Sequence, residues 1–214
     1  MNHRLAGFSL LLAACAGSEP PPPSPTAPSS AQTPPPAMQA APGGSWAVPD
    51  GFRSETIPFP LEFAPTLDHR GVEELRFAPG FFDPTAPGYW SYTFVWRVED
   101  AALLDAAGLS RELDLYFRGL LTAVDAAAVQ ALRDPIAVTA APAGQGFAIT
   151  ARVVDAFKTK RPLTLTGRAE RRACPGGALW IFALSPESSG VRDQLTALAS
   201  EAACGQAPVP NKPR

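Results

Sequence analysis

A proline-rich segment near the start of the 214-residue chain limits where a folded core can form. Between residues 16 and 45 the sequence consists mainly of Pro, Ala, Ser, Gly and Thr, with four consecutive prolines at 20–23 and three at 34–36. Such a segment has too few large apolar side chains to offset the entropy of ordering its backbone, and its prolines favour extended polyproline II geometry. We therefore predict a disordered linker over residues 15–45 and a single globular domain over residues 46–205. Use of the linker as a proline-rich ligand for a partner domain is the alternative.

The first fifteen residues have the pattern of an export signal. A short basic start is followed by an apolar run over residues 5–14, which is too short to span a bilayer because a transmembrane helix needs about 20 apolar residues. The run ends in Leu12-Ala13-Ala14-Cys15, which resembles the lipobox of bacterial lipoproteins. In that family the peptide before the cysteine is removed, so the resemblance implies that residues 1–14 are a signal peptide and that Cys15 is lipidated. An ordinary signal peptide with a chance cysteine is the alternative.

The lipobox resemblance also implies a location and partners. It places the domain in the cell envelope of a Gram-negative bacterium, lipid-anchored at the outer membrane and facing the periplasm. The expected partners are the membrane, through the lipid at Cys15, and either an envelope protein or cell-wall glycan. Residues 57–99 loosely resemble bacterial envelope proteins of unknown function, and this second resemblance implies no activity. Residues 206–214 are expected to be a disordered tail.

The charge balance argues against a nucleic-acid partner. The chain has 18 basic and 20 acidic side chains, which gives a formal net charge of −2, and its Lys and Arg residues are scattered. Binding that depends on releasing counterions from a phosphate backbone needs clustered basic side chains. The densest basic spot, at residues 170–172, is therefore interpreted as the solvated end of a strand.

Two cysteines remain once Cys15 is assigned to the lipid. Cys174 and Cys204 lie in an oxidising compartment if the chain is exported, so we expect a disulfide between them. A two-cysteine metal site, the alternative, needs further ligands, and His69 has no spacing that links it to either cysteine. We predict no metal and no other cofactor.

Alternating apolar and polar residues predict strands in both halves of the domain, with helices after the first group and at the end. The expected strands or extended segments cover residues 57–63, 72–78, 90–99, 136–141, 147–157, 163–174 and 178–184. One expected helix has Ser110 as its N-cap and a short helical turn after it, and the last helix buries Val191, Leu195 and Leu198. This order predicts an α+β fold with an antiparallel sheet of about five to six strands and two helices packed on one face. An all-β sandwich with two peripheral helices is the alternative.

Few side chains in the predicted domain are suited to catalysis. His69 lies in a turn-like segment without an accompanying nucleophile or metal motif, so we interpret it as a solvated turn histidine. Glu73 and Glu74 are adjacent on a strand, which places them on opposite faces where they cannot form an acid–base pair. Asp155 precedes two lysines and is interpreted as part of a surface charge cluster. We predict no catalytic residue.

The connection over residues 79–90 is the candidate binding surface. It carries four aromatic residues, Phe81, Phe82, Tyr89 and Trp90. Loops of this kind usually fold back over a sheet edge, and an exposed platform for sugar, peptide or protein is the alternative. We predict that at least one of Phe82, Tyr89 and Trp90 is exposed beside a groove, with Arg76 nearby to supply a polar contact.

These patterns favour a class of function without naming a ligand. We expect a membrane-anchored envelope lipoprotein whose domain is a non-catalytic binding or scaffolding module. The alternative is an envelope or cell-wall hydrolase that uses carboxylates not identifiable from the sequence. A cleft with two carboxylates roughly 5–10 Å apart would favour the glycosidase form of that alternative.

Overall fold

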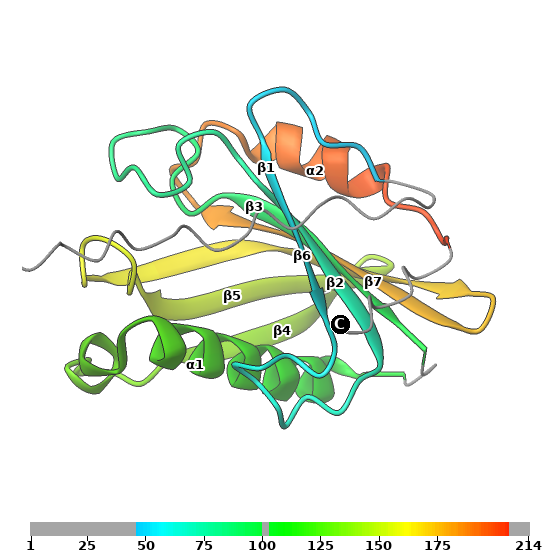
Figure 1. Ribbon diagram of the computed structural model, residues 1–214, viewed down its shortest axis with the longest axis horizontal. Helices are drawn as coiled ribbons and strands as arrows, with labels where there is room; N and C mark the ends of the chain where they lie inside the picture. The colour runs from blue at the N-terminus through cyan, green and yellow to red at the C-terminus, as the bar shows by residue number, and fades with distance from the viewer. Residues whose placement is uncertain (1–45, 100–102, 206–214) are drawn as a thin grey trace, which may run out of the picture. The chain divides into compact units, whose positions relative to one another are not determined.

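The computed structural model describes residues 46–99 and 103–205, so the predicted signal peptide, lipidated cysteine, linker and tail lie outside the described residues. Within those ranges the chain forms a seven-stranded sheet and two helices (Figure 1). The strands are β1 Arg53–Pro58, β2 Gly71–Phe77, β3 Tyr92–Val98, β4 Ala137–Ala143, β5 Gly146–Val154, β6 Pro162–Cys174 and β7 Gly177–Pro186. The helices are α1 Ala106–Gln130 and α2 Arg192–Ser200. The α+β class is confirmed, with seven strands rather than five to six.

The sheet has the order β1-β2-β3-β7-β6-β5-β4, and every neighbouring pair of strands is antiparallel. Strands β1 to β3 form one meander and β4 to β7 form a second, and the two meanders join where β3 pairs with β7. The predicted strand over residues 178–184 corresponds to β7, which lies at the centre of the sheet. The edge strand β1 lies earlier than predicted because Pro58 and Pro60 supply no ladder donors, so the chain leaves the sheet there.

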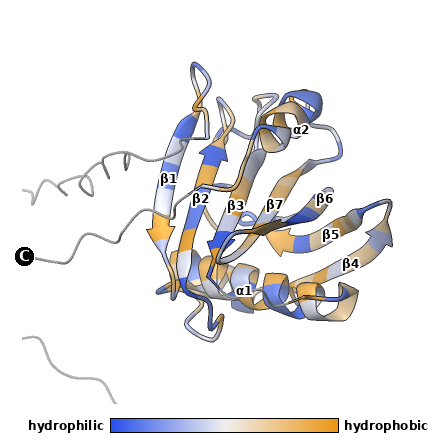
Figure 2. Cartoon of the chain, turned by 90° about the vertical axis from the view of Figure 1, so that its right-hand side faces the viewer, coloured by the Kyte–Doolittle hydropathy of each residue, from blue (hydrophilic) through white to orange (hydrophobic). Residues whose placement is uncertain are grey.

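The two helices pack on opposite faces of the sheet, so the prediction that both lie on one face is wrong (Figure 2). Phe94 and Trp96 of β3 join the core cluster beneath α1, whereas Val95 between them joins the cluster beneath α2. β7 alternates in the same way, with Phe182 toward α1 and Ile181 toward α2. The physical reason is that β7 carries apolar side chains on both faces and Val95 of β3 adds to the second apolar cluster, so both faces of the sheet centre need cover. All seven residues of β3 are consequently buried.

Helix α1 begins at Ala106, one turn before the predicted start. Its N-cap is Asp105, whose side chain accepts a hydrogen bond from the amide of Gly108 at 2.7 Å. Ser110, the predicted N-cap, lies inside the helix, where its hydroxyl accepts a hydrogen bond from the Ala140 amide of β4 at 2.8 Å. The backbone leaves helical geometry at Asp125, and the predicted second helical turn is the part of α1 beyond that kink.

The connection from β1 to β2 packs against α1. Gly119 of α1 makes this approach possible, because a Cβ atom there would lie 2.0 Å from the carbonyl oxygen of Phe63. On the other face α2 buries Leu195 and Leu198 as predicted, whereas Val191 precedes the helix and is half-buried. Neither helix in the described ranges has a stretch that is both long enough and apolar enough to cross a membrane.

Candidate functional site

The aromatic residues of the 79–90 loop are packed inside the fold. Trp90 is 1% exposed, Phe81 is buried, and Phe82 and Tyr89 are half-buried. Phe157, from the turn after β5, contacts the rings of Phe81, Phe82 and Trp90 at centroid distances of 6.5, 5.2 and 5.5 Å. The prediction of a substantially exposed ring at residue 82, 89 or 90 is therefore wrong, because Phe157 packs on Phe82 and Trp90, and Asp155 of the same distant segment binds the Tyr89 hydroxyl.

Arg76, the predicted polar partner of that loop, lies on the opposite face of the sheet. Its neighbour Phe77 packs beneath α1 with Phe81, whereas the Arg76 guanidinium lies 4.6 Å from the ring centroid of Trp46. Arg76 also donates hydrogen bonds to the carbonyls of Trp46 and Ala47 at 2.7 and 3.0 Å. Arg76 therefore fastens the start of the domain to the sheet. The five residues of the predicted binding surface, Arg76 and the four aromatic residues of the loop, consequently do not share one surface.

A buried network of charged side chains, the chain of charges, continues from Arg76 across the same face of the sheet. Glu74 accepts hydrogen bonds from Arg76 Nη2 at 3.4 Å and from Arg97 Nε at 2.5 Å. Arg97 Nη1 in turn donates to the carbonyl of Ala203 at 2.6 Å. The chain of charges thus holds Trp46 at one end of the domain and Ala203 at the other, which is a structural role.

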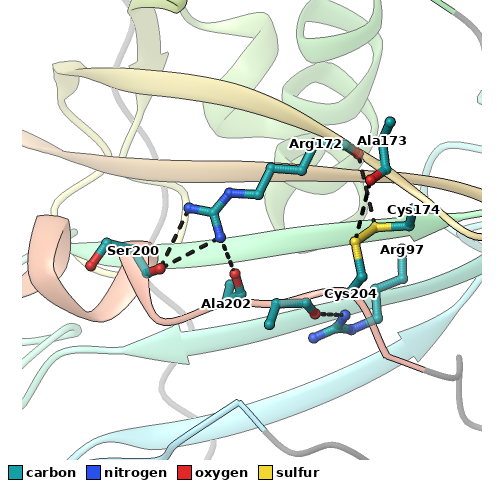
Figure 3. The surroundings of a disulfide bond; sticks show 8 residues. Arg97, Arg172, Ala173, Cys174, Ser200, Ala202 and Cys204 are labelled. Atoms are coloured by element: carbon teal, nitrogen blue, oxygen red, sulfur yellow. Dashed lines mark hydrogen bonds between the residues drawn. A yellow bond between two sulfur atoms is a disulfide. The ribbon is translucent and has the colours of Figure 1, made fainter.

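The predicted disulfide between Cys174 and Cys204 is confirmed, with their Cα atoms 5.5 Å apart (Figure 3). It joins the end of β6 to the segment after α2. Arg172 holds the same segment by donating hydrogen bonds to the carbonyls of Ser200 and Ala202. The basic spot at residues 170–172 is therefore partly structural rather than only a solvated strand end.

His69 is buried at 7% exposure, so its interpretation as a solvated turn histidine is wrong. Its Nε2 atom lies 2.9 Å from Glu112 Oε2 on α1, and its ring lies 5.5 and 5.9 Å from the rings of Phe59 and Trp96. Because the segment that carries His69 folds beneath α1, the histidine meets a carboxylate 43 positions away in the sequence. No local motif indicates that pairing.

Glu73 is a fully buried acid that the sequence patterns did not single out as buried. Its side chain is 0% exposed beneath α1 and accepts a hydrogen bond from Trp96 Nε1 at 3.1 Å. Burial raises the pKa of Glu73 to about 8, although hydrogen bonds from Trp96 and Tyr116 oppose the rise. Glu73 is therefore mainly protonated at neutral pH. Glu74 points to the other face, as the alternation along β2 predicted.

Asp155 is 0% exposed, so its interpretation as a surface charge is wrong. Its carboxylate accepts hydrogen bonds from the Tyr89 hydroxyl and from the backbone amides of Phe157, Lys158 and Thr159. Burial alone raises the pKa of Asp155, but the hydrogen bonds from Tyr89 and Thr159 lower it more, to about 2. An ionised Asp155 thus organises the turn after β5 from within.

A crevice of about 340 Å³ opens beside α2, on the face of the sheet that α1 does not cover. Helix α2 lies over β3 and β7, and no helix in the described ranges covers β4, β5 and β6 on that face (Figure 2). Apolar side chains of β7 and α2 line one part of the crevice: Ile181, Ala183, Leu195 and Ala199. Its polar lining side chains are Thr150, Thr166, Arg168, Glu170, Ser185, Arg192, Thr196 and Ser200.

The strand register determines which side chains lie next to one another on this face of the sheet. It places Thr139, Thr150, Thr166 and Ser185 side by side across β4, β5, β6 and β7. In the next row the register places Arg168 between the small residues Ala148 and Ala183. Arg192 reaches from α2 across the crevice and donates to Thr166 Oγ1 at 2.9 Å and to the Pro186 carbonyl at 3.0 Å. The crevice therefore combines an apolar floor with hydroxyl and guanidinium groups.

Sequence patterns did not identify this crevice. A second hollow, of about 430 Å³, lies beside the disulfide. The crevice includes one carboxylate, Glu170, and the second hollow includes one, Glu99, so neither holds a pair. Among residues 46–99 and 103–205, no group of three or more His, Cys, Asp and Glu side chains is placed to hold a metal ion.

Comparisons with known proteins add no relative from which a function can be transferred. No family model matches the chain, and neither a curated protein nor a solved structure matches it. The function has to be inferred from the side chains themselves, and the crevice beside α2 is the best candidate site that they form.

Proposed function

We propose that the protein is a lipid-anchored envelope lipoprotein whose domain is a non-catalytic binding module, with the crevice beside α2 as its binding site. The observation that carries this proposal is the composition of the crevice. A concave, partly apolar surface with a few converging polar groups is the usual form of a ligand site. The motif Leu12-Ala13-Ala14-Cys15 supports the anchor. In this proposal the domain lies at the outer membrane, facing the periplasm, and binds an envelope protein or cell-wall glycan.

The placement of the titratable side chains supports binding rather than catalysis. His69 is paired with Glu112, and Asp155 accepts four hydrogen bonds within its own loop. Glu73 is enclosed beneath α1. None of these three residues lines the crevice. The hydrolase alternative gains no support from the crevice, because Glu170 is its one carboxylate and a glycosidase of the usual kind uses two.

Mass spectrometry and cell fractionation test the anchor. The full-length protein, expressed in a Gram-negative bacterium, should begin at Cys15, carry acyl chains and sediment with the outer membrane. The variant Cys15→Ser should keep its signal peptide or appear without lipid. A mature protein that begins elsewhere and carries no lipid would contradict the anchor.

Substitution of two matched alanines tests the crevice. Ala148 and Ala141 are both exposed and are paired neighbours on β5 and β4, but only Ala148 lines the crevice. Ala148→Trp should fill the crevice and reduce co-sedimentation with purified cell-wall sacculi, whereas Ala141→Trp should bind as the native protein does. Equal binding by both variants would contradict the crevice as the site. Release of soluble glycan fragments by the native protein would contradict a non-catalytic role.

A further inference from the structure

We propose that the crevice beside α2 binds an extended peptide segment through one acidic side chain, which Arg168 and Arg192 recognise. This inference rests on the proposed function as a binding module and names the class of its ligand. Three observations carry it: the charge of the crevice, the hydrogen-bond partners of the two arginines, and the dimensions of the floor.

Neither arginine is neutralised within the described part of the chain. Arg168 donates to the carbonyl of Ala143 at 3.2 Å, and Arg192 donates to the Thr166 hydroxyl and to the Pro186 carbonyl. These acceptors are all uncharged, and no described carboxylate lies within ion-pair distance of either guanidinium. Guanidinium groups bind carboxylates through paired, charge-assisted hydrogen bonds, so both arginines are able to receive an anion.

Three other arginines on the same face have acidic partners, whereas Arg152 has none among the described residues but lies outside the crevice. Arg76 and Arg97 both pair with Glu74, and Arg172 lies 4.0 Å from Glu170. Two arginines and one glutamate line the crevice, which leaves a formal charge of +2 − 1 = +1 there. That charge suits a single carboxylate, because Glu170 would repel a dianionic group such as phosphate more strongly than a singly charged group.

The dimensions of the crevice suit a short extended chain. Its length along β6, from Thr166 to Glu170, is four residue steps, or about 13 Å at roughly 3.3 Å per residue. The small side chains of Ala148 and Ala183 leave room beside Arg168. Strands β5, β6 and β7 are interior strands whose backbone groups already pair, so the peptide cannot bind by adding a strand. Its backbone would instead bond to hydroxyls such as those of Thr150 and Thr196.

Titration of the full-length, ¹⁵N-labelled protein in detergent with two synthetic peptides tests the proposal. The probe is Ac-Ala-Ala-Glu-Ala-Ala-NH₂, and the matched peptide carries Gln in place of Glu. The Glu peptide should shift the amide signals of residues 166–170 and 192–200, and the Gln peptide should bind at least about tenfold more weakly because it lacks the charge. Raising the salt concentration should weaken binding of the Glu peptide.

Arginine variants give the residue-level control. Arg168→Gln should weaken binding of the Glu peptide about tenfold, and because Arg168 is exposed the variant should fold normally. Arg152→Gln removes an arginine of β5 that is also exposed on this face of the sheet but lies outside the crevice, and it should leave the affinity unchanged. Arg192→Lys keeps the charge and should weaken binding less than Arg168→Gln does.

The outcomes separate this proposal from the broader one. Equal binding of the Glu and Gln peptides, or tighter binding of inorganic phosphate at the same amides, would overturn the acidic peptide as the ligand. Absence of peptide binding, while sedimentation with sacculi still depends on residue 148, would also overturn it and leave the binding module standing. If Ala148→Trp changes neither peptide binding nor co-sedimentation with sacculi, both proposals fail.

Discussion

The hydroxyl of Tyr89 donates a hydrogen bond of 2.5 Å to Oδ2 of Asp155, a residue 66 positions away in the sequence. Burial, together with the adjacent Asp155 carboxylate, raises the pKa of Tyr89 to about 12, so the hydroxyl keeps its proton as a donor. This bond fastens the aromatic loop over residues 79–90 to the turn after β5, where Phe157 covers the rings. The loop is consequently a structural joint between the two meanders of the sheet.

Asp155→Asn should lower the free energy of unfolding by about 2–3 kcal/mol, because a neutral amide replaces a buried anion that accepts four hydrogen bonds. The native pKa of Asp155, about 2, lies below its ordinary value of 3.8. The stability that Asp155 contributes is therefore present above about pH 4 and is lost as the pH falls through 2. Urea unfolding at pH 7 and pH 3 measures both effects. Tyr89→Phe removes one hydrogen-bond donor and should lower the free energy of unfolding by less. An Asp155→Asn variant as stable as the native protein would contradict the structural role of this contact.

Glu73→Gln should remove a pH dependence of stability. Burial raises the pKa of Glu73 from 4.5 in its ordinary state to about 8 in the folded protein. The folded state holds this proton more tightly than the unfolded state does. The stability that protonated Glu73 contributes is therefore fully present below about pH 4.5 and is lost as the pH rises through 8. At pH 9 the Gln variant should be more stable than the native protein, by on the order of 3–5 kcal/mol. Denaturant unfolding between pH 5 and 9 checks this, and a native protein whose stability does not fall over that range contradicts it.

His69→Ala should lower stability and leave binding intact. The substitution removes the contact with Glu112 and a ring packed against Phe59 and Trp96, which should cost about 1–3 kcal/mol. Arg70→Ala, at an exposed neighbouring position, is the matched control and should change stability little. Thermal unfolding and the peptide titration measure the two properties separately. Loss of binding by a variant that stays as stable as the native protein would show instead that His69 is functional.

Replacing both Cys174 and Cys204 by serine should lower the free energy of unfolding by roughly 3–4 kcal/mol, because the disulfide closes a loop across a sequence separation of 30 residues in the unfolded chain. The domain should still fold, since Arg172 and Arg97 continue to hold the segment after α2 through its carbonyls. Addition of a reductant to the native protein should reproduce the loss. Identical unfolding curves with and without reductant would mean that the two cysteines are not joined in solution.

Local sequence patterns determined the features that depend on neighbouring residues. Side chains alternate across a strand, so the placement of Glu73 and Glu74 on opposite faces was predictable. The class of the fold followed from the order of the periodic segments. The pairing of Cys174 with Cys204 followed because, with Cys15 assigned to the lipid, no other cysteine was left.

The tertiary structure alone decided the features that depend on residues far apart in the chain. The pairing of β3 with β7 brings Phe94 opposite Phe182, and only then is it clear that both faces of these strands need a helix. His69 meets Glu112, Tyr89 meets Asp155, and Arg192 reaches Thr166 because the chain folds back on itself. A local pattern records which face a side chain is on, but the element that covers that face is set by packing between distant segments. The crevice beside α2 is formed in this way, from strands and a helix that no single stretch of the sequence brings together.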